Sequence, residues 1–434
     1  PYRVVTGFDR PNLYFAVERT DSKRKLARIA TYALEHAEDS GIVYCSTRKD
    51  TEAVCNALVA AGVRATRYHA GLTAAERTAN QQAFICDDAP VMVATNAFGM
   101  GIDKSNVRYV IHHNMPASIE AYYQEAGRAG RDGLPSVCLL FWSEKDLSTC
   151  RFFIEQESTN EELSSEEREC VRQSRRRMLA AMEGYCLTCD CLRGYLLHYF
   201  GEEVATAADP ANCGNCGNCE GGFERVDVTG EARAIMRCVQ ELRGEWGKGM
   251  VVDVLRGSKS EKVSSFGLDR ANAYGTLPQA SIAHLKDVVE LLVAGRYLDI
   301  SEGKFPKVGF GPNYRAAATP EFSLFMKRLV RKSERSGGAF GGRAFGSSGT
   351  KGSSGLPDGA QDKLFERLRA LRKRLSSEQG IAPYMVFSDA TLRDMCARLP
   401  QNDDEFLEVN GVGQAKLERF GDAFLAEIAA FGNR

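Results

Sequence analysis

The sequence has 434 residues, and its 56 basic and 57 acidic side chains give a formal net charge of −1 at pH 7. A chain of this length is too long for one ordinary hydrophobic core, so two to four domains are expected. The sequence contains no apolar run of about 18 residues, so no membrane-spanning helix is predicted. No signal-peptide pattern opens the sequence, so its 14 cysteines are expected to be reduced thiols or zinc thiolates of a cytoplasmic protein rather than disulfides.

From residue 8 to about residue 155, helical stretches alternate with short apolar runs. Helices are expected at residues 22–38, 49–61 and 74–86, and buried strands at residues 41–45, 91–94, 109–112 and 137–141. This alternation predicts an α/β domain with a parallel sheet and helices on both faces. The functional groups of such sheets gather beyond the carboxyl ends of the strands.

Two arginines stand out in residues 122–133, which read Y-Y-Q-E-A-G-R-A-G-R-D-G. Arg128 and Arg131 are three residues apart, so they would fall on one helical face, and their forked donors suit phosphate oxygens. An isolated arginine pair more often lies on a solvated face. Here the pair follows residues 91–104, an apolar strand that runs into a Gly-rich loop with Thr95 and Asp103.

Together these two segments resemble the last two motifs of superfamily-two helicases, and Q-E-A-G-R-A-G-R-D-G resembles the RecQ DNA helicases in particular. Residues 67–72 resemble a further helicase motif, Y-H-A-G-L. Taken alone, His69 is more often a packed histidine, and it is given no acid–base role. Asn114 departs from the family pattern, in which an acidic residue commonly stands at that position.

The resemblance implies a RecA-like lobe that shares ATP and Mg²⁺ with another lobe. It implies that Arg128 and Arg131 reach the γ-phosphate and stabilise the charge that develops during hydrolysis, as an arginine finger does. The other residues that the resemblance assigns are Asp103, Gly101 and Gln124 for the nucleotide, and Arg48 and Thr95 for coupling to the tracked DNA strand.

A cysteine cluster dominates residues 156–222, which are expected to form a helical module. Cys213, Cys216 and Cys219 follow one another at zinc-ligand spacing, which leaves Cys186, Cys189 or Cys191 as the fourth ligand. Similarity to the RecQ pattern after its first ligand favours Cys191. A closed four-sulfur site has no open position for water, so the implied Zn²⁺ is structural. Unrelated buried thiols are the alternative.

Residues 223–333 are expected to form a winged helix. Helices are predicted at residues 229–244 and 279–295, and two strands, 296–301 and 305–310, would flank a short wing. Residues 247–257 resemble the RecQ-specific pattern G-x-G-x-V-V-x-V-L/I-R-G. Winged helices bind duplex DNA, although they also serve as protein-contact modules. The expected apolar face of the second helix consists of Ile282, Leu285, Val288, Val289 and Leu292.

A Gly/Ser-rich linker at residues 334–356 leads into a small all-α domain at residues 357–434, which resembles the HRDC domain. Leu364, Leu368, Leu371 and Leu375 follow helical spacing. Residues 409–416 resemble a helix–hairpin–helix turn, in which Gly411 and Gly413 would let backbone N–H groups approach a phosphate and Lys416 would add charge. Tyr384 stands where family members stack a single-stranded base, and packing is the equal alternative.

The sequence lacks a phosphate loop, G-x-x-x-x-G-K-[ST], and an Asp-Glu-x-His segment. We therefore expect a fragment that corresponds to the C-terminal portion of a RecQ helicase and that binds DNA without hydrolysing ATP. The intact family unwinds DNA in the 3′-to-5′ direction in repair and recombination.

The resemblance implies DNA, single-stranded and duplex or forked, as the partner, a single-strand DNA-binding protein as a further candidate, and a nucleoid-associated location in the cytoplasm. A non-catalytic DNA-binding scaffold is the alternative function. An RNA helicase is disfavoured by the combination of modules.

Overall fold

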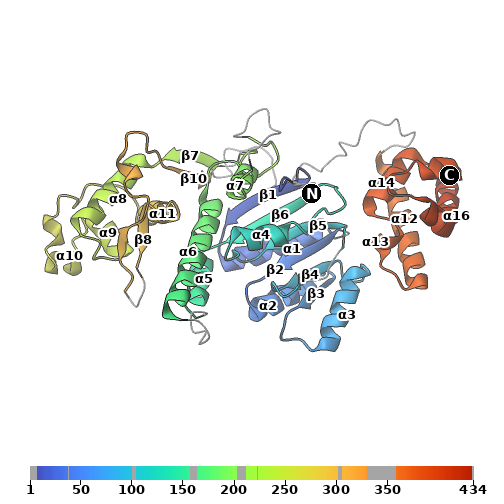
Figure 1. Cartoon of the computed structure of the whole chain (residues 1–434), viewed down its shortest axis with the longest axis horizontal. Coiled ribbons are helices and arrows are strands. Elements are labelled where there is room, and N and C mark those ends of the chain that lie inside the picture. The colour runs from blue at the N-terminus through green and yellow to red at the C-terminus, as the bar shows by residue number, and fades with distance from the viewer. Residues whose placement is uncertain are drawn as a thin grey trace. The chain divides into compact units, whose positions relative to one another are not determined.

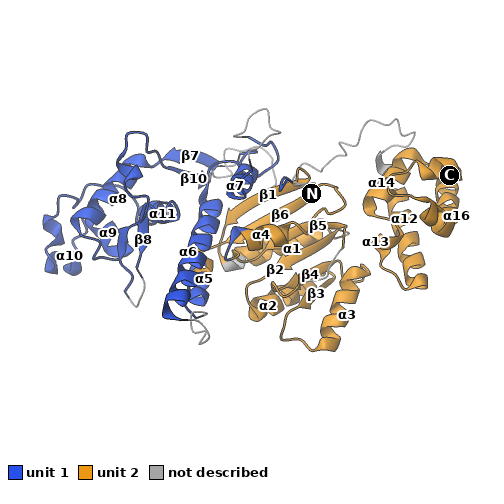
Figure 2. Cartoon of the chain, viewed as in Figure 1, with its two compact units in different colours: residues 1–9, 117–119, 147–335 blue, residues 10–116, 120–146, 336–434 orange. Residues whose placement is uncertain are grey.

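A computed structural model of the chain describes residues 7–37, 39–99, 104–156, 164–202, 212–221, 223–301, 305–329 and 358–432. The expectations for Gly101, Asp103, the tip of the wing and the Gly/Ser-rich linker lie outside these residues. No helix in the described part of the chain has the length and apolar character needed to cross a membrane. The chain divides into two compact units, one formed by residues 1–9, 117–119 and 147–335 and the other by residues 10–116, 120–146 and 336–434 (Figure 2).

The α/β domain is built on a six-stranded sheet of order β1-β6-β5-β2-β4-β3, in which every neighbouring pair is parallel. The sequence predicted four of these strands. It did not predict β1 or β3, because β3 is only half-buried and β1 mixes apolar and charged residues. The strands are β1 (Leu13–Arg19), β2 (Ser40–Tyr44), β3 (Ala65–Tyr68), β4 (Val91–Ala94), β5 (Val107–His112) and β6 (Ser136–Trp142).

Helices cover both faces of this sheet, as predicted. Alternate residues of a strand point to opposite faces. In β5, Tyr109 and Ile111 join a core with residues of α1 and α2, whereas the His112 ring lies 5.0 Å from that of Tyr122 in α4. The helices are α1 (Ser22–Glu35), α2 (Arg48–Ala60), α3 (Ala74–Ile85) and α4 (Ile119–Ala126) (Figure 1).

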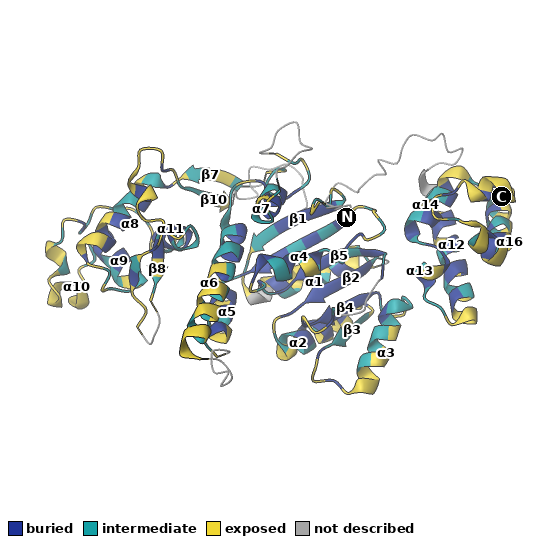
Figure 3. Cartoon of the chain, viewed as in Figure 1, coloured by how far each residue is buried: buried dark blue, intermediate teal, exposed yellow. Residues whose placement is uncertain are grey.

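Local capping sets where two of these helices begin. The Thr47 hydroxyl accepts a hydrogen bond from the Asp50 N–H, and Thr73 forms a capping box with Glu76. The strands of the sheet are mostly buried, while the outer faces of the helices are exposed (Figure 3). Arg48 and Thr95 follow the carboxyl ends of β2 and β4. The turn with Arg128 and Arg131 instead follows α4 and is bonded at Gly130 to the starts of β5 and β1, which differs from the expectation for the arginines.

The other unit begins with three helices and continues into the winged helix. The first three are α5 (Glu144–Gln156), α6 (Ser165–Leu187) and α7 (Leu192–Tyr199). The winged helix contains α8 (Thr229–Glu241), α9 (Lys248–Leu255), α10 (Glu261–Ser265) and α11 (Ile282–Ala294), with 3₁₀ turns η2 (Leu268–Arg270) and η3 (Ala316–Ala318). Its antiparallel strand pairs are β7 (Phe223–Asp227) with β10 (Phe325–Leu329) and β8 (Leu298–Ile300) with β9 (Val308–Phe310).

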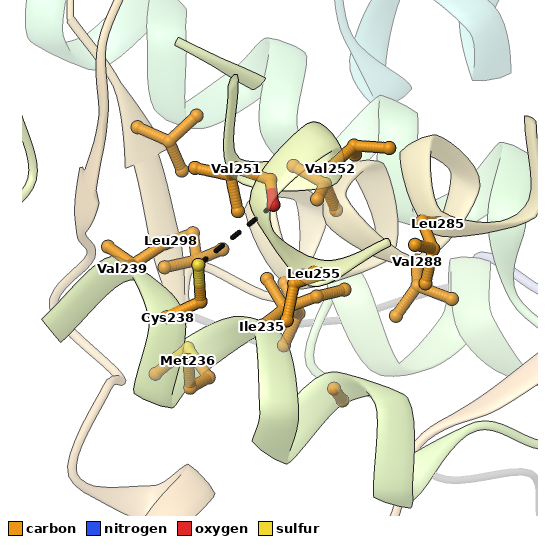
Figure 4. Close-up of a cluster of buried hydrophobic side chains, with 14 of the residues drawn as sticks. Ile235, Met236, Cys238, Val239, Val251, Val252, Leu255, Leu285, Val288 and Leu298 are labelled. Atoms are coloured by element: carbon orange, nitrogen blue, oxygen red, sulfur yellow. Dashed lines mark hydrogen bonds between the residues drawn. The ribbon is translucent and has the colours of Figure 1, made fainter. Parts of the chain in front are cut away.

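One apolar core joins α8, α9 and α11 (Figure 4). Leu285, Val288 and Leu292 are fully buried there, as the helical spacing predicted. The expectation for Ile282 was wrong, because this side chain is 43% exposed. It is the first residue of α11, directly after the Ser281 cap, and lies before the turns that pack on the core.

The small C-terminal domain is entirely helical in its described residues, as predicted. Its core surrounds Phe387, whose ring makes edge contacts with those of Phe406, Phe420 and Phe424 at 5.9, 6.0 and 4.9 Å. The predicted Leu364 and Leu368 are fully buried. The helices are α12 (Asp358–Gln379), α13 (Pro383–Val386), α14 (Asp389–Arg398), α15 (Asp403–Leu407) and α16 (Gln414–Gly432).

Candidate functional site

Arg128 and Arg131 lie on a tight turn directly after α4. Arg131 is exposed and Arg128 is half-buried. The turn depends on Gly130, whose φ is +55° and whose N–H donates to the Val107 carbonyl at 2.8 Å. A Cβ atom at this position would lie 2.4 Å from Nδ2 of Asn12, so only glycine fits.

Three side chains outside the motif fix this turn. Nη2 of Arg10 donates to the carbonyl of Gly130 at 2.9 Å, and Nδ2 of Asn12 donates to the same oxygen at 2.9 Å. Arg108 forms an ion pair of 2.6 Å with Asp132, which is almost completely buried. The sequence analysis missed Arg10, Asn12 and Arg108. Their only signal is a polar residue at the start of a strand, and only the fold brings them to the turn.

The guanidinium of Arg128 also has a defined neighbour. Its Nη2 would lie 2.7 Å from a Cβ atom at Gly99, so the guanidinium lies beside the loop that follows β4. Its Nε is buried and has no hydrogen-bond partner among the described residues. Such an unsatisfied donor on an arginine can be satisfied by an anionic ligand.

Two other predicted residues follow the carboxyl ends of strands. Arg48 opens α2 immediately after β2, and Thr95 follows β4, which pairs with β2. Arg48 is exposed and lies across Gly71, where a Cβ would be 3.2 Å from its Cδ. Thr95 is buried, and its carbonyl accepts from the Phe98 N–H at 2.9 Å. Gln124 is exposed on α4.

His69 and Asn114 both have structural partners. His69 is 5% exposed, and its Nε2 lies 2.8 Å from Oε1 of Glu52. Asn114 accepts from the Ser46 N–H at 3.1 Å and donates to Oδ1 of Asp146 at 2.9 Å. Asp146 is itself bound to buried Lys25, so position 114 needs a donor that a carboxylate cannot supply.

The cysteine cluster contains four thiols that come together in space. The Sγ atoms of Cys191, Cys213, Cys216 and Cys219 all lie within 4.8 Å of one another. Backbone N–H groups point at the sulfurs, among them that of Gly194, 3.3 Å from Cys191 Sγ. Four such thiols fit a tetrahedral zinc ion with no open position. Of the three candidates for the fourth ligand, Cys191 is the one whose sulfur lies in this cluster.

In the C-terminal domain, the predicted turn residues have mixed surroundings. Gly411 has φ of +85°, and a Cβ there would lie 2.5 Å from Oγ1 of Thr391, so packing explains this glycine. Gly413, just before α16, has open space around it. The Lys416 ammonium lies 5.4 Å from the centre of the Phe387 ring, and burial lowers its pKa. Tyr384 is partly exposed on α13.

Comparison with known proteins identifies four family models in succession. These are the helicase conserved C-terminal domain (residues 23–133), RecQ zinc-binding (144–220), the RQC domain (222–335) and the HRDC domain (361–428).

Named relatives match almost the whole chain. The chain is 39% identical over 428 residues to the ATP-dependent DNA helicase RecQ of Bacillus subtilis, covering 99% of this chain and 66% of the relative. The ATP-dependent DNA helicase RecQ of Haemophilus influenzae is 33% identical, with 98% and 65% covered. The RecQ-like DNA helicase BLM of Xenopus laevis is 31% identical, with 97% and 31% covered.

A parallel-sheet helicase lobe followed by a four-cysteine module, a winged helix and a helical domain defines the C-terminal portion of a DNA helicase. This chain belongs to the RecQ family and corresponds to that portion. It spans about two thirds of the length of the two bacterial relatives, 66% and 65%.

Proposed function

We propose that this chain supplies the second motor lobe and the DNA-binding modules of an ATP-dependent DNA helicase that moves in the 3′-to-5′ direction in DNA repair and recombination. ATP and Mg²⁺ would bind between this lobe and one that carries a phosphate loop. Arg128 and Arg131 would then contact the γ-phosphate. We place the protein in the cytoplasm, at the nucleoid, where its DNA lies.

The observation that carries this proposal is the fixed turn after α4. A finger arginine must be held in position before the charge develops, and such a side chain contributes about 10³- to 10⁵-fold to turnover. Arg131 is exposed, the backbone of the turn is bound by Arg10 and Asn12, and Nε of Arg128 has no partner among the described residues. Asp103, Gly101 and Gln124 are proposed as further nucleotide contacts.

Two modules are suited to DNA. Phe305, beside the wing, is 78% exposed, and the Phe310 and Tyr314 rings lie 5.1 Å apart with Arg315 against Tyr314. Exposed rings stack on bases and guanidinium groups bind phosphates. We therefore propose a duplex or forked DNA contact on the winged helix. Arg48 and Thr95 would contact the single strand on the lobe.

The C-terminal domain would add a second single-strand contact through Tyr384, Gly411, Gly413 and Lys416. Because Gly413 directly precedes α16 and is unobstructed, it is the better of the two glycines for a phosphate. A single-strand DNA-binding protein is proposed as a protein partner. The zinc ion would have a structural role.

The isolated chain provides the first test. It should bind forked DNA with an affinity that falls steeply as salt rises, since Lys and Arg release counterions from phosphates, and it should hydrolyse ATP only at background rate. Fluorescence anisotropy and a phosphate-release assay measure the two properties. Robust DNA-stimulated turnover by the 434-residue chain would contradict the proposal.

A protein completed with a phosphate-loop lobe provides the second test. Arg131→Ala should lower kcat by about 10³-fold or more and leave DNA affinity unchanged. The control is Arg64→Ala, which removes an exposed arginine just before β3, at the opposite edge of the sheet. The alternative, a non-catalytic DNA scaffold, is not favoured because the relatives are named as ATP-dependent helicases. It would gain support if Arg131→Ala left turnover unchanged.

A further inference from the structure

The segment in front of β1 is bound by the end of α7. The backbone N–H of Phe8 donates to both carboxylate oxygens of Glu202 at 2.8 Å, although 194 positions separate the two residues. The Phe8 ring stacks on that of Phe200, with centroids 4.6 Å apart and 12° between the planes. The next residue, Asp9, forms an ion pair of 3.7 Å with Nε of Arg193. Two consecutive residues therefore contact one short stretch of the zinc-binding module three times.

The geometry of α7 explains how one stretch supplies all three contacts. Arg193 and Phe200 are seven residues apart, which is two helical turns, so they lie on one face of the helix. The helix then ends in a left-handed turn, in which Gly201 has φ of +79° and the Glu202 N–H donates to the Leu197 carbonyl at 2.8 Å. This turn brings the Glu202 carboxylate toward the segment in front of β1.

The other end of α7 belongs to the cysteine cluster. Cys191 is the N-cap of this helix, and its sulfur accepts from the Gly194 N–H at 3.3 Å. Residues 191–202 read C-L-R-G-Y-L-L-H-Y-F-G-E, the part of the sequence that is similar to the RecQ pattern after its first zinc ligand. Only the cysteine of this stretch belongs to the described ligand cluster. The metal therefore does not explain Arg193, Phe200 and Glu202, whereas the contacts with residues 8 and 9 explain all three.

The ion pair is the more protected of the polar contacts. Arg193 is 8% exposed, so its guanidinium has left most of its water and needs an opposite charge nearby. Asp9 supplies that charge from the segment in front of β1. Release of the segment would remove this counter-charge from a buried cation, which favours the bound state.

The same segment leads directly into the residues that hold the arginine turn. Arg10 and Asn12 follow Asp9 in the sequence, and both donate to the carbonyl of Gly130 at 2.9 Å. In the proposed helicase the phosphate-loop lobe is joined ahead of this segment, because the chain corresponds to the C-terminal portion of its relatives. Residues 8–12 are then the last part of the connection between the two motor lobes.

A connection that is held at a fixed point limits the positions of the lobe that it carries. The effective concentration of a tethered partner falls as the free tether becomes longer, and each released residue gains conformational entropy. Closure of the two lobes around ATP is therefore less favourable when residues 8 and 9 are free.

We propose that Arg193, Phe200 and Glu202 are positioning residues that anchor the connection between the two motor lobes to the zinc-binding module. The inference rests on the proposed function. Through this anchor the module contributes to ATP turnover from a place outside the nucleotide site.

Glu202→Ala tests the anchor in the 434-residue chain without nucleotide. Hydrogen exchange at the Phe8 amide should become about tenfold faster or more, because the variant removes a charged acceptor. The matched control is Glu166→Ala, which removes an exposed glutamate in the first turn of α6 of the same module and should leave this amide unchanged. Unchanged exchange in Glu202→Ala, or an equal increase in both variants, would overturn the proposal.

Two substitutions of Phe200 test the stacking in the lobe-completed helicase. Phe200→Leu removes the ring and should lower kcat and raise the KM for ATP together, each by about 3- to 10-fold, as changes at a hinge do. Glu202→Ala should have the same effect. Phe200→Tyr keeps the ring and should retain both constants.

Zinc content and affinity for forked DNA separate the anchor from a general loss of structure. Both should remain at the parent level in Phe200→Leu and Glu202→Ala, because neither residue is a zinc ligand. Parent values of kcat and KM in both variants would overturn the proposal. A loss of turnover that comes with a loss of zinc in both would also overturn it.

Arg131→Ala distinguishes failure of the anchor from failure of the proposed function. If Arg131→Ala lowers turnover and Glu202→Ala and Phe200→Leu do not, the anchor is wrong and the arginine role stands. If Arg131→Ala leaves turnover unchanged, the proposed function itself fails.

Discussion

At the scale of single residues, the arginine turn shows how a motif depends on side chains outside it. Gly130 satisfies a positive φ and also makes room for Asn12 and Ser136, whose Oγ would lie 2.7 Å from an added Cβ. Gly133 also has a positive φ, +81°, but no atom lies within 4 Å of its Cβ position. Substitutions at these two glycines can therefore distinguish the free-energy cost of backbone strain from that of a steric clash.

Gly130→Ala should destabilise the lobe more than Gly133→Ala. An alanine in the left-handed region costs about 1–2 kcal/mol at either site, and the clash with Asn12 should add about 1–3 kcal/mol at position 130. Urea unfolding followed by Trp142 fluorescence, in a Trp246→Phe background, measures the lobe alone because the chain has two tryptophans. Equal destabilisation by the two variants would contradict the clash.

At the scale of elements, four helices meet around a buried carboxyl pair. Glu183 of α6 is 1% exposed and lies 3.6 Å from Arg151 of α5, and the nearby carboxyl of Glu290 of α11 acts on its pKa. Lys248 of α9 forms an ion pair with Glu290. Burial raises the pKa of Glu183 to about 8, with Arg151 opposing and Glu290 reinforcing the shift. Since two neighbouring buried carboxylates repel each other, a proton on Glu183 is favoured.

This pair should make the stability of the winged-helix unit depend on pH. The folded unit keeps the proton up to about pH 8, whereas the unfolded chain loses it near the ordinary value of 4.5. The stabilisation is therefore complete at low pH and is lost as pH rises, at up to about 1.4 kcal/mol per pH unit within that window. Glu183→Gln should remove this slope.

Unfolding followed by Trp246 fluorescence between pH 5 and pH 8, in a Trp142→Phe background, measures the slope. Glu261→Gln is the control, since Glu261 is an exposed glutamate at the start of α10. It should keep the slope of the parent chain. A Glu183→Gln variant with the same slope as the parent would show that the carboxyl pair does not hold the proton.

At the scale of the whole molecule, the two units have separate apolar cores, and the zinc cluster belongs to only one of them. The cysteine segment is tied to its own unit. Nδ2 of Asn218 donates to the Thr188 carbonyl at 3.0 Å, and its Oδ1 accepts from Lys327 of β10 at 2.8 Å. Loss of the metal should therefore destabilise that unit before the other.

Removal of zinc should lower the unfolding midpoint reported by Trp246 and leave that reported by Trp142 unchanged, because metal binding is part of the folding free energy only where the ligands lie. Cys191→Ser should reproduce this effect and lose the bound zinc, measured by elemental analysis. Cys189→Ser should retain one zinc per chain. Zinc loss in the Cys189 variant but not in the Cys191 variant would contradict the ligand set.

The sequence alone determined the order of the modules, the parallel sheet, the presence of the arginine pair and three of the four cysteines that cluster. These features depend on local spacing: apolar periodicity, Gly-bounded loops and cysteines two residues apart are readable within a few residues of one another. The resemblance to RecQ helicases rested on the same local segments. Burial at helix ends was predicted less accurately, as Ile282 shows, because a helix can begin before its first buried turn.

Only the tertiary structure decided what holds these residues in place. Arg10, Asn12 and Arg108 reach the arginine turn from the starts of the strands β1 and β5. The fourth cysteine was selected by the distance between its sulfur and three others. Such contacts depend on which strands become neighbours, and strand order is fixed by burial of the whole sheet rather than by any single segment of sequence.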